Sequence, residues 1–189
     1  SLYILLERTV EWAVHQSLWI AQADVRQAFD HLEAGMALHV LEQWSVHPRL
    51  CFAVAEELKD IVAEASLFQC KTNPFKYLKT RQGGKEASAF WNLVFRSILL
   101  TYLPKWIELC IGVHIDNFGL IQHMLWADNL VVVAPAEHDI LIVLDDVSEV
   151  LHSLGMAWKP SSLKYISTET AAPLQLSWRT GEVLYEMPR

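Results

Sequence analysis

The amino-acid sequence predicts an α+β domain in which an antiparallel sheet carries helices packed on one face. The predicted elements follow the order helix, strand, helix, helix, short strands, helix, β-hairpin, helix and strands, which is typical of that class. Apolar residues make up 52% of the chain and charged residues 20%, and eight residues are Trp, so a large core is available. The length of 189 residues is that of a single domain.

The first third of the chain predicts three helices and one strand. Residues 2–15 place apolar side chains at helical spacing, whereas residues 18–24 form a short apolar strand that ends in a carboxylate. A second helix begins at Ala28 and is broken by the pair His47-Pro48. Apolar residues at the same helical spacing predict a further helix over residues 50–66.

The next stretch changes from strand to helix. Residues 67–80 lose the helical period, and Asn73-Pro74 marks a turn between short strands. A helix then begins near residues 86–88 and continues to about Tyr102. We expect it to end there because Pro104 follows, and proline removes a helical hydrogen bond.

A β-hairpin is predicted near the middle of the chain. Two apolar runs, residues 120–126 and 130–133, meet at Ala127-Asp128-Asn129. Asp and Asn tolerate the positive φ angles of tight turns, so the pattern predicts a hairpin with a carboxylate at its tip. On these residues alone, an ordinary surface turn between two core strands is the favoured interpretation. If the strand that ends at Asp24 is a neighbour in the same sheet, the two carboxylates meet at one edge.

The remaining third predicts a helix and a second hairpin. Pro135 suits the first turn of a helix, a broad apolar stripe follows, and Gly155 ends it. The final residues, 173–188, alternate enough to predict a hairpin that turns at Thr180-Gly181. Three acidic residues lie off the apolar stripe, and we interpret them as a solvated face and not as a site: Asp145, Asp146 and Glu149.

The net charge of −7 argues against a protein that simply coats nucleic acid, because such proteins are normally basic. One segment of the chain is nevertheless basic. This strip, residues 71–85, contains no acidic residue and has Phe75 and Tyr77 interleaved. It is either a solvated loop or a surface that contacts the phosphates and sugars of a nucleic acid. Its cationic residues are Lys71, Lys76, Lys79, Arg81 and Lys85.

Cysteine usage and hydropathy predict an intracellular protein. Three widely spaced Cys predict no disulfide partner, and Cys110 with His114 lacks the two further ligands of a structural zinc site. No apolar run reaches the roughly 18 residues of a membrane span. The chain begins at Ser1 within a helical pattern and shows no signal peptide, so we expect a nuclear or cytoplasmic location.

Two carboxylates that meet at a sheet edge repel each other, and a divalent cation usually resolves the repulsion. Magnesium takes one or two carboxylates together with substrate phosphates, and paired ions assist phosphoryl transfer. If Asp24 and Asp128 meet, the residue chemistry therefore predicts an acidic metal site beside a basic loop that contains Gly83 and Gly84.

Four segments, in order, resemble the palm motifs of reverse transcriptases, especially those of non-LTR retrotransposons and group II introns. Asp24-Val-Arg-Gln-Ala-Phe-Asp30 resembles the first palm motif, and Arg81-Gln-Gly-Gly-Lys-Glu-Ala-Ser-Ala-Phe90 resembles the Arg-Gln-Gly motif. Trp126-Ala-Asp-Asn129 stands where the family has an aromatic-Ala-Asp-Asp box, and Leu154-Gly-Met-Ala-Trp-Lys-Pro160 resembles the motif after it. Together they span roughly residues 18–165.

The resemblance implies an RNA-directed DNA polymerase palm of retroelement origin, with an RNA template, a DNA primer and dNTPs as partners. It implies catalytic roles for Asp24, Asp128 and Asn129, with two Mg²⁺ or Mn²⁺ ions held by Asp24, Asp128 and the backbone carbonyl of Val25. The resemblance also assigns the nucleotide pocket and the nucleic-acid surface. The pocket would use Phe29, Gln82 and Gly83, and the surface would use Lys71, Lys76, Lys79, Arg81 and Lys85.

This chain departs from the family pattern at several positions. Asn129 replaces the second Asp of the box and removes one negative charge, and Trp126 replaces a smaller aromatic residue. The lysine of the last motif corresponds to either Lys159 or Lys164. We expect one reverse-transcriptase-like domain over residues 1–189, with the palm at about residues 16–168, most of the fingers missing and the thumb absent.

Two other interpretations stay open. The chain is either a catalytically inactive relic that at most binds nucleic acid or a partner through the basic strip, or an unrelated α+β interaction domain with chance motif matches.

Overall fold

The structure is a computed structural model that describes residues 17–59, 62–64, 66–67, 70–76, 85–115, 119–169, 173–176 and 182–187. The described residues form two compact units. The first contains the residues up to Arg26 together with those from Ile98 onward, and the second runs from Gln27 to Ser97. The helix predicted over residues 2–15 lies outside the described residues. None of the described helices is long and apolar enough to cross a membrane.

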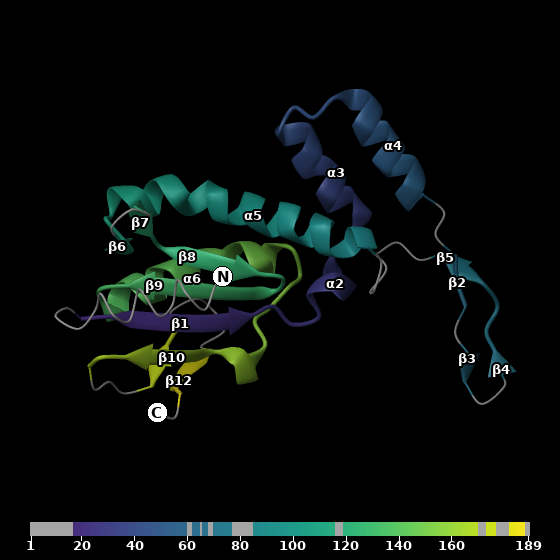
Figure 1. The fold of residues 1–189 in the computed structure, drawn as a ribbon. Helices are drawn as coiled ribbons and strands as arrows, with labels where there is room; N and C mark the ends of the chain where they lie inside the picture. Colours follow the sequence, from purple (N-terminus) through teal and green to yellow (C-terminus); the bar gives the residue numbers. More distant parts are fainter. Residues whose placement is uncertain are drawn as a thin grey trace. The chain divides into compact units, whose positions relative to one another are not determined.

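A six-stranded sheet with the strand order β11-β12-β10-β1-β9-β8 organises the first unit (Figure 1). All neighbouring strands are antiparallel except β10 and β12, which run parallel. This confirms the predicted antiparallel sheet and adds one parallel pair. The strands are β1 (Trp19–Asp24), β8 (His123–Trp126), β9 (Asn129–Ala134), β10 (Lys164–Ser167), β11 (Leu174–Gln175) and β12 (Val183–Glu186).

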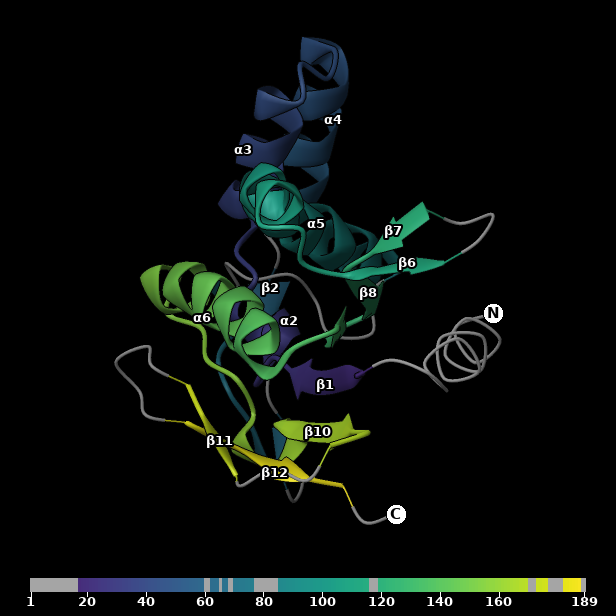
Figure 2. The ribbon, with the colours of Figure 1, turned by 90° about the vertical axis from the view of Figure 1, so that its left-hand side faces the viewer.

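One face of this sheet is covered by helix α6 (Glu137–Ser153), which contacts both β1 and β9 (Figure 2). Trp19, Ala21 and Ala23 alternate along β1 and are fully or almost fully buried. The apolar stripe of α6 is buried as well, and the helix ends where Gly155 adopts a φ of 71°. The predicted helix and its glycine stop are therefore confirmed, although Pro135 precedes the helix, which begins at Glu137, and does not lie in its first turn.

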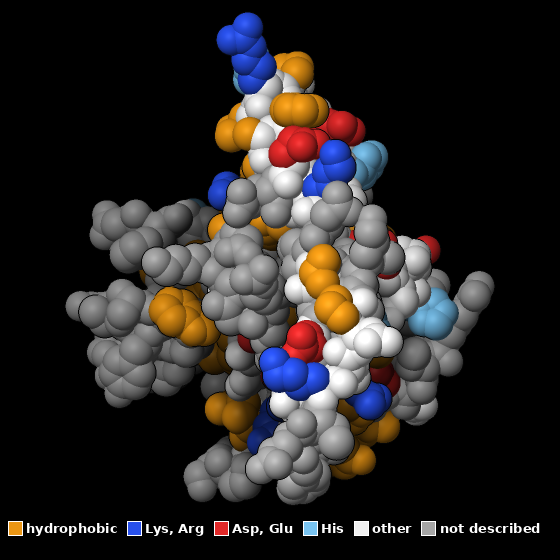
Figure 3. Space-filling model, turned by 90° about the vertical axis from the view of Figure 1, so that its right-hand side faces the viewer, with side chains coloured by type: hydrophobic (Ala, Val, Ile, Leu, Met, Phe, Trp, Pro, Cys, Tyr) orange, Lys and Arg blue, Asp and Glu red, His pale blue; other side chains and the backbone are white. Residues whose placement is uncertain are grey.

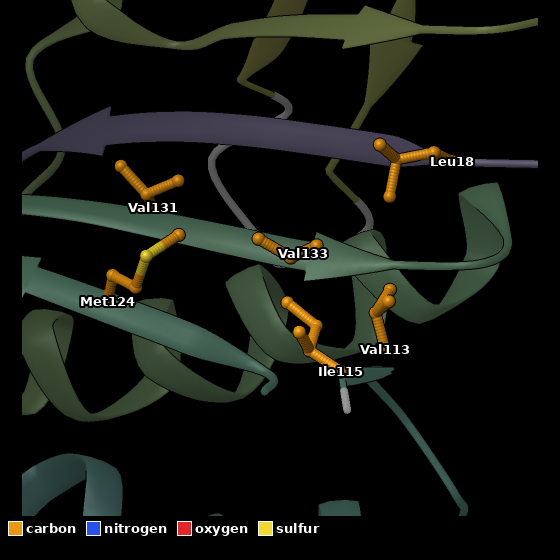
Figure 4. Close-up of a cluster of buried hydrophobic side chains, with 6 residues drawn as sticks. All are labelled: Leu18, Val113, Ile115, Met124, Val131 and Val133. Atoms are coloured by element: carbon orange, nitrogen blue, oxygen red, sulfur yellow. The ribbon is translucent and has the colours of Figure 1, made fainter. Parts of the chain in front are cut away.

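The other face of the sheet carries a second hydrophobic cluster, to which β6 (Val113–Ile115) contributes. Antiparallel pairing joins β6 to β7 (Gly119–Ile121). The single apolar run predicted over residues 120–126 is thus divided at Gln122 between two strand pairs, β6–β7 and β8–β9. Figure 4 shows the side chains of the cluster pointing toward one another: Leu18, Val113, Ile115, Met124, Val131 and Val133.

Helix α5 (Lys85–Glu108) does not end before Pro104 as predicted. Pro104 lies on the exposed side of the helix, where water can satisfy the carbonyl group that proline leaves without a donor. Two residues later Trp106 is completely buried, and its indole N–H donates to Asp146 of α6 at 2.9 Å. Tertiary packing of this turn outweighs the local effect of proline.

Asp146 corrects the interpretation of the acidic residues of α6 as a solvated face. Its side chain is 12% exposed, and besides the Trp106 indole it accepts two hydrogen bonds from Lys105 Nζ, at 2.6 and 2.8 Å. Glu149 accepts a longer hydrogen bond, 3.5 Å, from the Tyr102 hydroxyl. Asp146 is therefore a structural acceptor that joins α5 to α6.

The second unit contains α2 (Ala28–His31), the helix pair α3 (Ala34–Gln43) and α4 (Pro48–Leu58), and two short two-stranded sheets. Hydrophobic side chains gather on the surface of the α3–α4 pair (Figure 3). A cavity of about 600 Å³ between these helices is lined by residues that include Leu38, Val46 and Phe52. None of the lining residues is one that the sequence predicts to bind metal, nucleotide or nucleic acid.

The predicted helix over residues 50–66 is wrong at both ends. Pro48 begins α4, and the Nδ1 atom of His47 accepts the Arg49 backbone N–H as a helix cap. The helix ends at Leu58, and the following residues form strands. Strand β2 (Val62–Ala63) pairs with β5 (Phe75–Lys76), and β3 (Ser66–Leu67) pairs with β4 (Cys70–Lys71). Cross-strand pairing thus replaces the last helical turns.

Asp146→Ala should destabilise the protein by about 2–3 kcal/mol, because the buried indole N–H of Trp106 loses its acceptor. Asp146→Asn keeps an acceptor oxygen and should cost about 1 kcal/mol or less. Glu149→Ala on the same helix is the control, with an expected change within about 0.5 kcal/mol. Urea unfolding measures all three. Equal effects of Asp146→Ala and Glu149→Ala would show that Asp146 is not a structural acceptor.

Candidate metal centre

Strand β1, which ends at Asp24, lies next to the β8–β9 hairpin, which carries Asp128, so the condition for the two residues to meet at one edge of the sheet is fulfilled. Asp24 is the last residue of β1 and stands opposite Asn129, the first residue of β9. The next backbone N–H, of Val25, donates to the carbonyl of Asp128 at 3.2 Å. The Asp128 carboxylate is close enough to Asp24 to contribute to the raised pKa of its carboxyl group. Strand pairing therefore determines the position of both carboxylates.

The tip of the β8–β9 hairpin differs in detail from the prediction. Trp126 pairs with Asn129, so the turn consists of Ala127 and Asp128 alone, and Asn129 belongs to strand β9. Ala127, not Asp or Asn, adopts the positive φ, 53°. The Asp128 carbonyl accepts a hydrogen bond from the backbone N–H of Val25, which is distant in the sequence. Turn propensities describe neighbouring residues only, so they cannot predict this contact.

Residues 157–162 hold the backbone of Asp24 in place. The Asp24 N–H donates to Ser162 Oγ at 2.9 Å, and its carbonyl accepts the Lys159 N–H at 2.7 Å. Val25 forms an antiparallel bridge with Trp158. Trp158 is buried, and its indole N–H donates to Ser148 Oγ of α6 at 2.6 Å. The position of Asp24 thus depends on α6 through this segment.

The electrostatic environment of Asp24 is unfavourable for a lone carboxylate. Burial, and then the neighbouring Asp128 carboxylate, raise the pKa of Asp24 above its ordinary value. The Lys159 ammonium opposes this rise, with Nζ 3.7 Å from Asp24 Oδ2. Asp24 Oδ1 is buried and receives no hydrogen bond within the described part of the chain. An unsatisfied carboxylate oxygen beside a second carboxylate fits a divalent cation that prefers oxygen ligands.

Asn129 is engaged with a neighbour on the same face of the sheet. Its Oδ1 accepts a hydrogen bond from Gln22 Nε2 at 3.1 Å. Across the described ranges, no group of three His, Cys, Asp or Glu side chains could hold a metal. The site therefore offers two carboxylates, Asp24 and Asp128, and an amide whose oxygen already has a donor.

The remaining predicted site residues belong to the second unit or lie outside the described residues. Phe29 is half-buried in α2, with its ring centroid 6.3 Å from that of Trp91. Lys71 is exposed, and its Nζ lies 2.8 Å from Glu64 Oε1. Lys76 lies in β5 and Lys85 begins α5. Four predicted residues fall outside the described ranges: Lys79, Arg81, Gln82 and Gly83.

Sequence reasoning missed Gln22 and Ser162. Gln22 lies two residues before Asp24 on the same strand, so the period of two places both side chains on one face and could have identified it. Ser162 closes the short 3₁₀ turn Pro160–Ser162, and no local signal connects it with Asp24. Of the two candidate lysines, Lys159 contacts Asp24, whereas Lys164 is exposed on β10 opposite Gln22.

An antiparallel sheet with helices on one face and paired carboxylates at one edge defines a domain of the polymerase palm type. The sequence model of the family described as "Reverse transcriptase (RNA-dependent DNA polymerase)" matches residues 4–171 of this chain. Because the match covers most of the chain, the protein belongs to the reverse transcriptase family. No curated protein sequence matches it.

Solved telomerase structures have a similar fold. Apo telomerase from Candida tropicalis, truncated from its C-terminal domain, aligns with a TM-score of 0.69 at 9% identity, covering 94% of this chain and 38% of that one. Candida tropicalis telomerase in complex with a TWJ fragment of telomeric RNA aligns with a TM-score of 0.64 at 11% identity. The alignment covers 93% of this chain and 30% of that one. The corresponding Candida albicans complex aligns with a TM-score of 0.63 at 10% identity, over 93% of this chain and 31% of that one. The likeness concerns the fold alone, and this chain spans about a third of their length.

Asp24→Asn should stabilise the metal-free protein at neutral pH by up to about 1 kcal/mol, the order of the repulsion between two unit charges in contact in water. Because the native pKa of Asp24 is raised, its contribution to stability is largest below the unfolded value near 3.8 and is lost as pH rises through the native pKa. The gain from Asp24→Asn should therefore disappear in acid. Thermal unfolding with EDTA between pH 3.5 and 7.5 measures it, and a constant difference over this range would contradict the assignment.

Proposed function

We propose that this domain is the palm of a retroelement-derived RNA-directed DNA polymerase, of the kind found in non-LTR retrotransposons and group II introns. In this proposal the palm occupies about residues 16–168 and transfers nucleotides from dNTPs to the 3′-hydroxyl of a primer. One observation carries the proposal: strand pairing brings Asp24 and Asp128 together at the sheet edge, and Asp24 Oδ1 is buried without a hydrogen-bond donor in the described chain.

Asp24, Asp128 and the backbone carbonyl of Val25 would hold two divalent cations, Mg²⁺ or Mn²⁺. When bound, such ions stabilise the charge that develops on the attacking and leaving oxygens of phosphoryl transfer. The contribution of the protein is to keep the ligands in position before substrate arrives. Ser162 Oγ and the Lys159 N–H fix both backbone polar groups of Asp24, so its carboxylate needs little reorganisation on binding metal.

The substrate contacts in this proposal follow the family motifs. Phe29, Gln82 and Gly83 would contact the incoming nucleotide. The basic residues would contact the phosphates of an RNA template and a DNA primer, and the setting would be intracellular. They are Lys71, Lys76, Lys79, Arg81 and Lys85.

The arrangement of Asn129 favours a second candidate function. Its amide is neutral, and its oxygen already accepts a hydrogen bond from Gln22, so it lacks the charge of the usual second Asp and has one acceptor site fewer for a metal. A chain with this substitution could persist as a domain that binds nucleic acid without synthesis. The two functions differ in one measurable property, which is nucleotide incorporation.

Asn129→Asp should raise primer extension on an RNA template by about tenfold, because a third carboxylate makes metal binding more favourable by about 1.4 kcal/mol. Gln22 Nε2 can donate to the new carboxylate as it does to the amide, so the substitution should fold normally. We expect weak Mn²⁺-dependent extension by the unaltered chain. Loss of a residue that only supports a metal ligand typically lowers activity by ~10–100-fold. Asp24→Asn removes a proposed ligand itself, so it should reduce primer extension by more than this.

Extension with Mg²⁺ or Mn²⁺, dNTPs and an annealed DNA primer measures these effects, with Asp24→Asn as the matched inactive control. If neither the unaltered chain nor Asn129→Asp extends a primer that both bind, the polymerase proposal fails and the nucleic-acid-binding function is favoured. If the Asp24→Asn variant extends as well as the unaltered chain, the carboxylate pair is not the catalytic site.

A further inference from the structure

We propose that Lys159 is the resident counter-ion of the Asp24–Asp128 pair: its ammonium group neutralises Asp24 when no metal is bound and leaves when a divalent cation enters. Lys159 would then set the metal affinity of the site by competing for the same carboxylate. The inference rests on the proposed function only in taking this carboxylate pair as a metal site.

The geometry of Lys159 suits a cation that can be displaced. Its Nζ lies 3.7 Å from Asp24 Oδ2, and no other Lys, Arg or His of the described chain is within salt-bridge distance of that carboxylate. The Lys159 side chain is 55% exposed, whereas that of Asp24 is 16% exposed. More than half of the Lys159 side chain is therefore open to water, which can hydrate the ammonium when it leaves Asp24.

The backbone of Lys159 is held while its side chain is not. The Lys159 N–H donates to the Asp24 carbonyl at 2.7 Å, and the Lys159 carbonyl accepts the Ser162 hydroxyl at 2.7 Å. Both hydrogen bonds use backbone atoms of Lys159, so they survive substitution of the side chain by Met or Arg. The ammonium thus remains tethered beside Asp24, at a high local concentration, whether or not it contacts the carboxylate.

The energy of this contact determines how strongly Lys159 competes. Exposed ion pairs change equilibria by less than about fivefold, because water screens the charges and the side chain loses freedom when it is ordered. A divalent cation carries twice the charge and can bind both carboxylates directly. A divalent cation therefore displaces the ammonium, and Lys159 lowers the metal affinity of the site without preventing metal from binding.

Lys164 provides a matched control on the same side of the sheet. It lies on β10 directly opposite Gln22, and its side chain is exposed. Within the described chain it forms no ion pair with Asp24. Removing its charge takes one cation from this side of the sheet but leaves the contact between Lys159 and Asp24 intact.

Mn²⁺ binding to the full chain, followed by electron paramagnetic resonance, tests the proposal on four proteins. Lys159→Met removes the charge but keeps an unbranched side chain, and it should bind Mn²⁺ about two- to fivefold more tightly than the unaltered chain. Lys159→Arg keeps the charge and should restore the original affinity, and Lys164→Met should differ by less than Lys159→Met. The gain of Lys159→Met should shrink at 0.5 M salt.

Thermal unfolding adds a readout independent of activity. Lys159→Met should melt below the unaltered chain in EDTA, because the carboxylate pair loses its counter-ion, and the gap should close at saturating Mn²⁺. If the unaltered chain binds Mn²⁺ and Lys159→Met binds it equally or less tightly, the counter-ion inference is overturned and the metal site stands. If no variant binds Mn²⁺, the metal site of the proposed function is overturned together with the inference.

Discussion

The antiparallel pairing of β1 with β9 is the constraint on which the rest of the site depends. Its register places Asp24 opposite Asn129 and Trp19 opposite Ala134. Because side chains alternate between the two faces of a strand, a slip of one residue would turn Asp24 toward α6 and expose the apolar partners of that helix. Burial of Trp19, Ala21 and Ala23 against α6 therefore fixes the register that brings the carboxylates together.

A site of two adjacent carboxylates is a source of instability, and the surrounding structure compensates for it. The segment 157–162 binds the Asp24 backbone through Ser162 and Lys159, and Trp158 anchors that segment to Ser148 of α6. The helix that buries one face of the sheet thus also supports the edge where the charges meet. Stability and the candidate function depend on the same packing.

Local patterns predicted the elements that local chemistry determines. Strand β1, the β8–β9 hairpin, and α6 with its stop at Gly155 follow from periodicity and turn residues. The passage of α5 through Pro104 and the burial of Asp146 were not predictable in this way, because both depend on Trp106 packing against a helix 40 residues away. The approach of Asp24 to Asp128 was predictable, whereas Ser162 at Asp24 requires the pairing of β10 with β1.

In the proposed metal site, Asn129 and Lys159 would act in the same direction. An Asp at position 129 would give three carboxylates facing one ammonium, and a divalent cation would be needed to balance the charge. With Asn129 the pair carries two negative charges, and Lys159 lies 3.7 Å from one of its members, Asp24, so its single positive charge would balance half of the charge of the pair. Under the proposal, the missing third carboxylate would weaken the attraction for metal and at the same time increase the relative weight of the lysine.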